Sequence, residues 1–237
     1  RSIPFSGSNI GLDMSLVIAV ILGLVWGQII SHWGASILLH RYYCHKQFYV
    51  PKWYEAIGLF MLSVAYIRSP IGWIASHRMH HQYSDSANDP HSPNHVGWWR
   101  VFTTTWDIPK IPTKYARDLY TNPMLVFLHK HHFKILVIHW ALAILVSFFI
   151  PYFFVAYALM PFVQAKIGFG LINTMGHDNG PSNAPWINLF VAGEGYHKEH
   201  HDNWRRIRLH KFDTGGWAAE KLIQLGIFKS NKNLKKS

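Results

Sequence analysis

The sequence has little charge and almost no cysteine. Charged residues make up 15% of its 237 residues and only 12 residues are acidic, whereas about 25% of the residues of a soluble domain are charged. The single cysteine, Cys44, excludes an internal disulfide and fits a reducing compartment. Hydrophobic residues reach 49% and aromatic residues 16% of the chain. This composition favours a membrane protein with a substantial polar part outside the bilayer.

The net charge of +11 raises the question of a nucleic-acid partner. The basic residues lie beside apolar segments and form no groove with interleaved aromatic residues, so we expect no nucleic acid to bind. They cluster in residues 41–52, 100–134 and 198–236. The positive-inside rule places such clusters on the cytosolic side of a membrane.

Three apolar runs are long enough to cross a bilayer, at residues 12–39, 133–150 and 152–172. The first exceeds the thickness of the hydrocarbon core, so we expect it to project from the membrane and carry His40 on its end. Pro151 predicts a tight turn, and hence a hairpin, between the other two.

Residues 54–72 have a shorter apolar part, interrupted by Arg68 and Pro70, which predicts a re-entrant or interfacial segment. Residues 76–132 and 177–237 then form a cytosolic cap. The predicted fold is all-α: one domain, residues 1–237, forming a multi-pass helical membrane protein whose helical cap holds a histidine-rich dimetal site.

Three histidine clusters stand out among 17 histidines. Residues i, i+3 and i+4 of a helix share a face, so each H-x-x-H-H triple can point at one spot. Residues five apart differ by about 140° in direction, so the pair in HRYYCH suits two neighbouring ions or a helix that ends between them. Eight histidines exceed the four ligands of a tetrahedral zinc site, which predicts two metals, but ligand type alone does not choose among Zn, Cu, Fe and Ni. The clusters are His40 and His45; His77, His80 and His81; and His197, His200 and His201.

In this order the motifs HRYYCH, HRMHHQYSDSANDPHSP, NTMGH and GEGYHKEHH resemble those of the membrane fatty acyl desaturases of the stearoyl-CoA desaturase type, over about residues 12–203. The resemblance implies two irons at the cytosolic face, for which zinc can substitute in overexpressed protein. It adds His177 to the eight histidine ligands and implies that Asn173 contacts the site through water. Members often have four spans whereas three fit here, so we expect a further helix before residue 12 in the natural protein.

The resemblance further implies oxygen-dependent formation of a cis double bond in a long saturated acyl chain, with the ninth carbon the commonest position. It implies a bacterial inner membrane or the endoplasmic reticulum as the location. Ala75 and Ser76 stand where animal acyl-CoA enzymes carry Arg-Asp, so acyl-CoA, acyl-carrier-protein and acyl-lipid substrates all stay open. We find no haem-binding or flavin-binding segment, so the electrons come from a separate carrier such as ferredoxin, rubredoxin or cytochrome b5. A basic segment can steer an acidic carrier, and it comprises Arg205, Arg206, Arg208 and Lys211.

Other polar residues near the motifs have expected supporting roles. His91 and His95 are expected to shape their loop, Trp73, Trp98 and Trp99 to line an acyl tunnel or an interfacial belt, and the histidines of HKHH (129–132) to lie at the membrane interface. Flanking carboxylates can accept the second N–H of a metal-bound histidine, and the candidates are Asp85, Asp89, Glu194, Glu199 and Asp202.

Two alternatives stay open. One is the same di-iron chemistry ending in oxygen insertion, as in membrane hydroxylases of alkyl or lipid substrates. The other is a metal-binding or metal-transport membrane protein without enzymatic activity, which predicts histidines inside a span rather than at span ends.

Overall fold

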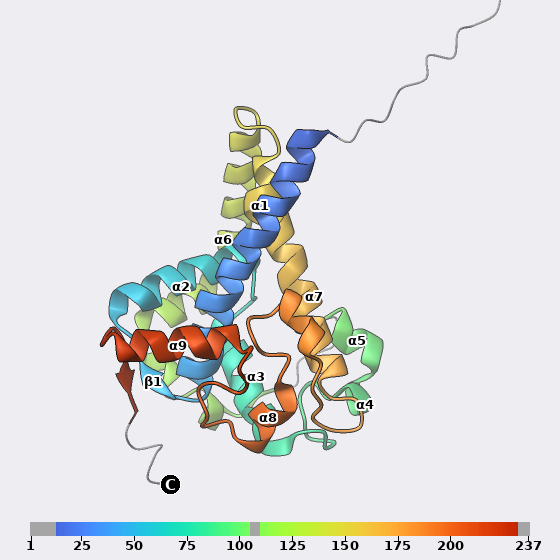
Figure 1. Ribbon diagram of the computed structural model, residues 1–237, viewed down its shortest axis with the longest axis vertical. Helices are drawn as coiled ribbons and strands as arrows, with labels where there is room; N and C mark the ends of the chain where they lie inside the picture. The colour runs from blue at the N-terminus through green and yellow to red at the C-terminus, as the bar shows by residue number, and fades with distance from the viewer. Residues whose placement is uncertain (1–12, 105–109, 232–237) are drawn as a thin grey trace, which may run out of the picture.

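The computed structural model describes residues 13–104 and 110–231 of the chain, and its described part is mostly helical. The helices of this part form two groups. A narrow bundle of long helices rises from a wider part made of shorter helices and loops (Figure 1). Residue 12 of the first predicted span and the last six residues of the lysine-rich tail lie outside the described residues.

The first helix is longer than predicted and changes its winding. Helix α1 (Met14–Ile30) continues without a break into a π-helix, η1 (Ser31–Cys44). Together they form a 31-residue helix that is long and apolar enough to cross a membrane. It runs five residues past the predicted end at residue 39, so that His40 lies on its last turns, where it enters the wider part (Figure 1).

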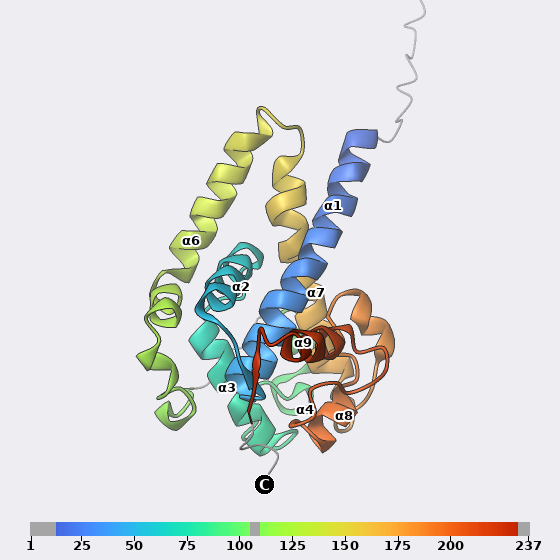
Figure 2. The same cartoon turned by 60° about the vertical axis from the view of Figure 1, so that its left-hand side comes forward.

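The predicted hairpin corresponds to α6 (Pro123–Ser147), a short π-helix η4 (Val155–Leu159) and α7 (Met160–Met175). Residues Val155–Met175 are long and apolar enough to span a membrane. Helix α6 is long enough to span but less hydrophobic than these helices, because Lys130, Lys134 and several histidines lie in its first half. Its upper half rises beside η4 (Figure 2), and the span at 133–150 stays a prediction.

The segment predicted as re-entrant is a bent pair of helices, α2 (Lys52–Ala65) and α3 (Pro70–Tyr83), at 92° to each other. Tyr66 and Arg68 adopt left-handed conformations with φ of 52° and 39°, which turn the chain. Ser69 then caps α3, because its hydroxyl accepts a hydrogen bond from the Gly72 N–H at 2.9 Å. The bend allows either a re-entrant loop or a broken span.

Short elements complete the wider part around the ends of the long helices (Figures 1 and 2). Two-residue strands, β1 (Phe48–Tyr49) and β2 (Lys229–Ser230), pair antiparallel, which the all-α prediction did not include. The other elements are α4 (Pro93–Val96), α5 (Trp98–Phe102), η2 (Thr113–Tyr115), η3 (Leu119–Thr121), η5 (Pro185–Leu189), α8 (His197–Asp202) and α9 (Thr214–Gln224).

The main hydrophobic core surrounds η1. Leu38 and Leu39 of η1 are fully buried and belong to one cluster with Ile74 of α3 and Phe228 near the carboxyl end. Trp33 stacks on Tyr54 of α2 with ring centres 4.4 Å apart. The helix that carries His40 is therefore held on several sides, which fixes the direction of its side chains.

Candidate metal centre

The π-helical winding brings His40 and His45 together. The N–H of His45 donates to the carbonyl of His40 at 3.1 Å, an i→i+5 bond that returns the chain to nearly the same face after five residues. Their ring centres lie 4.8 Å apart. Of the two arrangements expected from the sequence, the structure has the second, because η1 ends at Cys44, between the two histidines.

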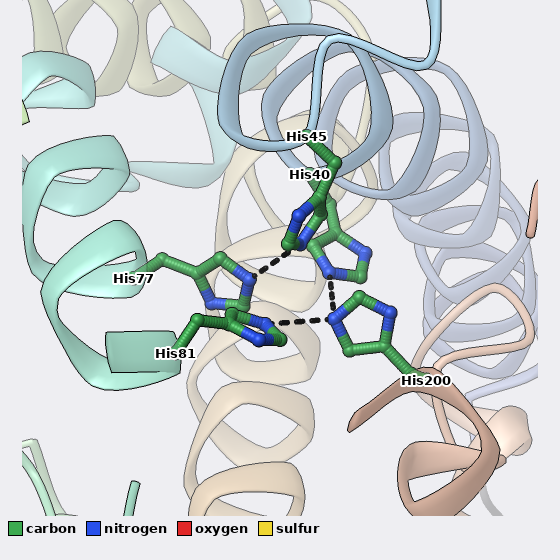
Figure 3. Close-up of side chains that lie close together, drawn as sticks. All are labelled: His40, His45, His77, His81 and His200. Carbon is green, nitrogen blue, oxygen red and sulfur yellow. Dashed lines mark hydrogen bonds between the residues drawn. The ribbon is translucent and has the colours of Figure 1, made fainter. Parts of the chain in front are cut away.

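All nine histidines of the predicted site converge, and they do so in two groups. In each group the ligand atoms lie within 4.8 Å of one another. Figure 3 shows the first group, with rings that reach a common point from η1 and its end, from α3 and from α8. The first group is His40, His45, His77, His81 and His200, and the second is His80, His177, His197 and His201.

Each H-x-x-H-H triple is divided between the groups rather than pointing at one spot. His77 and His81 join the first group and His80 the second, whereas His197 and His201 join the second and His200 the first. Residues i and i+4 lie within about 40° of each other on a helix, but i+3 and i+4 differ by about 100°. The face shared by three histidines is therefore wide enough to serve two centres. In each of α3 and α8 the middle histidine belongs to one group and the two outer histidines belong to the other.

Carboxylates hold three of these rings from behind. The Nδ1 atoms of His40 and His80 lie 2.7 Å from Glu194 Oε2 and 2.8 Å from Asp89 Oδ2. His177 Nδ1 lies 3.1 Å from both oxygens of Asp85. Each contact leaves Nε2 of the ring directed at the centre.

The other two carboxylates predicted to support the site are placed differently. Asp202 is exposed and pairs with Lys198 at 3.0 Å. Glu199 has one buried oxygen, Oε2, that finds no hydrogen-bond partner within the described part of the chain.

Arg41 and Asp213 form a buried support that the sequence reasoning missed. The Arg41 side chain contacts Glu194, and its Nη2 donates to both oxygens of Asp213, at 3.1 and 2.9 Å. Burial alone raises the pKa of Glu194, but the charge of Arg41, followed by the contact with His40, outweighs burial and holds that pKa well below its ordinary value. Asp213 is also the N-cap of α9, and the sequence signal for it was an aspartate directly before a helix start.

The rings of His197, His200 and His201 are kept neutral by their surroundings. Burial, and then the neighbouring histidines, lower the pKa values of His197 and His200 well below the ordinary value. The same causes lower the pKa of His201 to about 3. Neutral imidazole is the form that binds metal ions.

The donor set fits two transition-metal ions. Facing Nε2 atoms lie 3.0 Å apart for His40 and His200, 3.1 Å for His45 and His77, and 2.8 Å for His177 and His197. Two nitrogens bound to one ion at about 2.0–2.1 Å are expected roughly 3 Å apart. Neutral imidazoles that converge on one point also cannot all donate to one another, whereas a cation accepts all their lone pairs.

A third group, His80, Asp89 and His91, shares His80 with the second. The rings of His80 and His91 stack with centres 4.4 Å apart, and the backbone N–H of His91 donates to Asp89 Oδ1 at 3.0 Å. His91 thus lies where it can fix the loop that holds Asp89.

A cavity of about 570 Å³ connects the two histidine groups with the long helices. His40 and His77 of the first group and His197 of the second line it, and it continues past Phe169 between α1 and α7. Asn173 lines the same cavity and donates to the Phe169 carbonyl at 2.7 Å, while its contact with the centre through water stays a prediction.

Only one of the three tryptophans suggested for the acyl tunnel lines the cavity. Trp73 lines the cavity and stacks on His77 with ring centres 5.3 Å apart. Trp98 and Trp99 are 46% and 67% exposed and lie outside it.

Helices able to span a membrane and two buried histidine groups at one end of them define a membrane-protein class with a metal-binding centre. Residues 14–210 match the fatty acid desaturase family, and the chain belongs to that family. It is therefore an oxidoreductase that desaturates fatty acyl chains.

Known relatives are distant and cover most of the chain. The sn-1 stearoyl-lipid 9-desaturase of Anabaena variabilis is 29% identical over 78% of this chain and 71% of the relative. The Delta-9 acyl-lipid desaturase 1 of Arabidopsis thaliana is 27% identical over 84% of this chain and 66% of the relative. The sn-2 palmitoyl-lipid 9-desaturase of a Nostoc species (strain 36) is 29% identical over 95% of this chain and 82% of the relative.

Proposed function

We propose that this chain introduces a cis double bond at the ninth carbon of a saturated acyl chain carried by a membrane lipid. The observation that carries this proposal is the cavity, because it touches both histidine groups and extends between helices that can cross a membrane. An acyl chain in such a cavity passes the centre with its methylenes shielded from water. The relatives act on acyl lipids by name, which favours this carrier over acyl-CoA or acyl-carrier protein.

The nine converging histidines are proposed as ligands of two iron ions, with zinc as a substitute in overexpressed protein. When bound, the irons supply oxygen activation and the oxidising power that removes hydrogen from two adjacent methylenes. The protein contributes orientation and exclusion of water. Glu194, Asp89 and Asp85 hold the rings, and Trp73 packs against His77 at the cavity wall.

Electrons are proposed to come from a separate acidic carrier such as ferredoxin, rubredoxin or cytochrome b5. Trp204 stacks on His45 of the first group with ring centres 5.5 Å apart, and Arg205 lies over Trp204 at 4.9 Å. Arg206 is exposed beside them. The positive surface next to this ring supports an acidic partner.

The centre is proposed to face the cytosol, at a bacterial inner membrane or the endoplasmic reticulum. It lies at the end of the long helices where Lys46, Arg205 and Arg206 are also exposed. The positive-inside rule assigns that end to the cytosol.

Lipid profiling tests the function. Cells without a desaturase of their own would express the chain or its His80→Ala variant, and double bonds would be located by mass spectrometry. We expect a new monounsaturated acid that disappears in His80→Ala and persists in His131→Ala, whose half-buried ring packs on Phe127 away from the centre. Hydroxylated lipids would replace the proposal with the hydroxylase alternative, and an unchanged profile with several electron donors would contradict it.

A further inference from the structure

The cavity carries an excess of positive charge away from the histidines. Arg68, exposed at the bend between α2 and α3, and Lys166 of α7 both line it. Lys166 donates to the buried Thr104 hydroxyl at 2.8 Å, and the charge of Arg68 is near enough to act on it. Among the lining residues in the described part of the chain the one carboxylate is Glu194, which already contacts Arg41 and His40.

The position of Lys166 makes its positive charge energetically costly unless the charge has a binding partner. Lys166 lies within Val155–Met175, a segment able to span the membrane, where a cation is expensive and usually serves a function. Its hydroxyl partner carries no charge. A ligand anion between Lys166 and Arg68 removes their mutual repulsion and forms charge-assisted hydrogen bonds with both.

Gln164 adds a buried amide to the lining of this cavity. Its side chain is 3% exposed, neither amide atom has a hydrogen-bond partner among the described residues, and it lines the same cavity two residues before Lys166 on α7. A buried amide left unpaired costs about 1–3 kcal/mol. Its NH2 group can donate to an ester carbonyl of a bound lipid.

We propose that Arg68 and Lys166 bind the phosphate of a phospholipid head group while Gln164 binds its ester carbonyl. This inference rests on the proposed function and names its substrate as a phosphate-bearing acyl lipid. Lys166 lies seven residues before Asn173 on α7, a separation of about 10 Å, so the acyl chain of the anchored lipid extends along α7 towards the histidines. A membrane lipid is favoured over an acyl thioester because Lys166 and Gln164 lie inside a segment able to span the bilayer.

Binding of defined lipids tests the site without metal or electron carrier. The purified full chain in detergent would be titrated with phosphatidylglycerol and with monogalactosyldiacylglycerol of the same acyl chains, and bound lipid counted by native mass spectrometry. We expect about tenfold tighter binding of phosphatidylglycerol, lost in Lys166→Met and Arg68→Gln and retained in Lys166→Arg. Lys114→Met removes an exposed cation outside the cavity and should leave the preference unchanged.

Equal binding of the two lipids, or an unchanged preference in both cavity variants, would overturn the inference. So would displacement of phosphatidylglycerol by stearoyl-CoA at lower concentrations than by phosphatidylglycerol itself, since the phosphate would then belong to a thioester carrier. Failure of the proposed function looks different: phosphatidylglycerol binds with the expected preference but no unsaturated product forms in cells.

Discussion

At the scale of single residues, the carboxylates behind the histidines decide which nitrogen of each ring faces the centre. A contact at Nδ1 by Glu194, Asp89 or Asp85 favours the tautomer with the proton on that nitrogen, and this tautomer presents the Nε2 lone pair of His40, His80 or His177 to a metal. Asp89 has the most central position, because it is buried, contacts His80 and also accepts the backbone N–H groups of Asp85 and His91.

Replacing Asp89 by asparagine is expected to weaken metal binding by about 10–100-fold, because His80 loses its carboxylate partner and its fixed tautomer. The measurement is a titration of metal-free protein with zinc or ferrous iron in competition with a chelator. Asp202→Asn is the matched control, since Asp202 pairs with exposed Lys198 on the surface of α8. Equal affinities of Asp89→Asn and wild type would show that the His80–Asp89 contact has no part in metal binding.

Many residues of the site could be predicted from the sequence, because clustered histidines and aspartates indicate metal binding. The motif spacings identified eight of the nine histidines that converge, and the family resemblance added His177. Neighbouring carboxylates in the chain supplied three ring contacts. Asp213 was missed because it reaches Arg41 from 172 residues away in the chain, and no local pattern marks such a pair.

At the scale of elements, close contact between α5 and α7 fixes the position of α7, which forms one wall of the cavity. Gly170 of α7 faces the backbone of α5, and a Cβ at this position would come within 2.2 Å of the Phe102 carbonyl oxygen. Helix α7 carries Lys166, Gln164 and Asn173 into the cavity, so its contact with α5 fixes the position of this wall.

Gly170→Ala is expected to lower the free energy of unfolding by about 1–3 kcal/mol, because the added methyl group has to push two backbones apart. Thermal unfolding in detergent measures the change. Gly72→Ala is the comparison, since its nearest neighbours at 3.3 and 3.5 Å belong to the Ser69 side chain, which can move. A midpoint for Gly170→Ala equal to that of Gly72→Ala would contradict the close contact.

The element scale was less predictable than the residue scale. Hydropathy located the long helices, but the predicted span starts at residue 133 and α6 begins ten residues earlier, because its polar first half is stabilised by tertiary packing rather than by an apolar pattern. The π-winding of η1 was not predicted either. Winding depends on packing around the helix, and the residues Ser31–Cys44 carry no signal that distinguishes i→i+5 from i→i+4 bonding.

At the scale of the whole molecule, the concentration of buried neutral histidines makes the metal-free protein sensitive to acid. The folded-state pKa values of His45, His197, His200 and His201 lie below the unfolded value of about 6.5. Below pH 6.5 the unfolded chain therefore binds more protons than the folded chain, and stability falls as the pH falls, down to the folded pKa values.

Each such histidine contributes up to about 1.4 kcal/mol of lost stability per pH unit in this range. We expect the unfolding midpoint of metal-free protein to be nearly level from pH 8 to 7 and to drop steeply from pH 6.5 to 5. Circular dichroism at a series of pH values measures it. His131→Gln, which removes a histidine outside the centre, should keep the slope, and a level midpoint down to pH 5 would contradict neutral burial of the rings.

The buried pair of Arg41 and Asp213 also sets an order of events during synthesis. Arg41 adjoins the first ligand of the centre, and its charge is compensated by Glu194 and by Asp213 at the start of α9. A ribosome that has released only the first two hundred residues has produced all the histidines of one group but neither α9 nor β2, which pairs with β1 beside them. The contacts that hold Arg41 beside the histidines are therefore complete only after α9 has emerged.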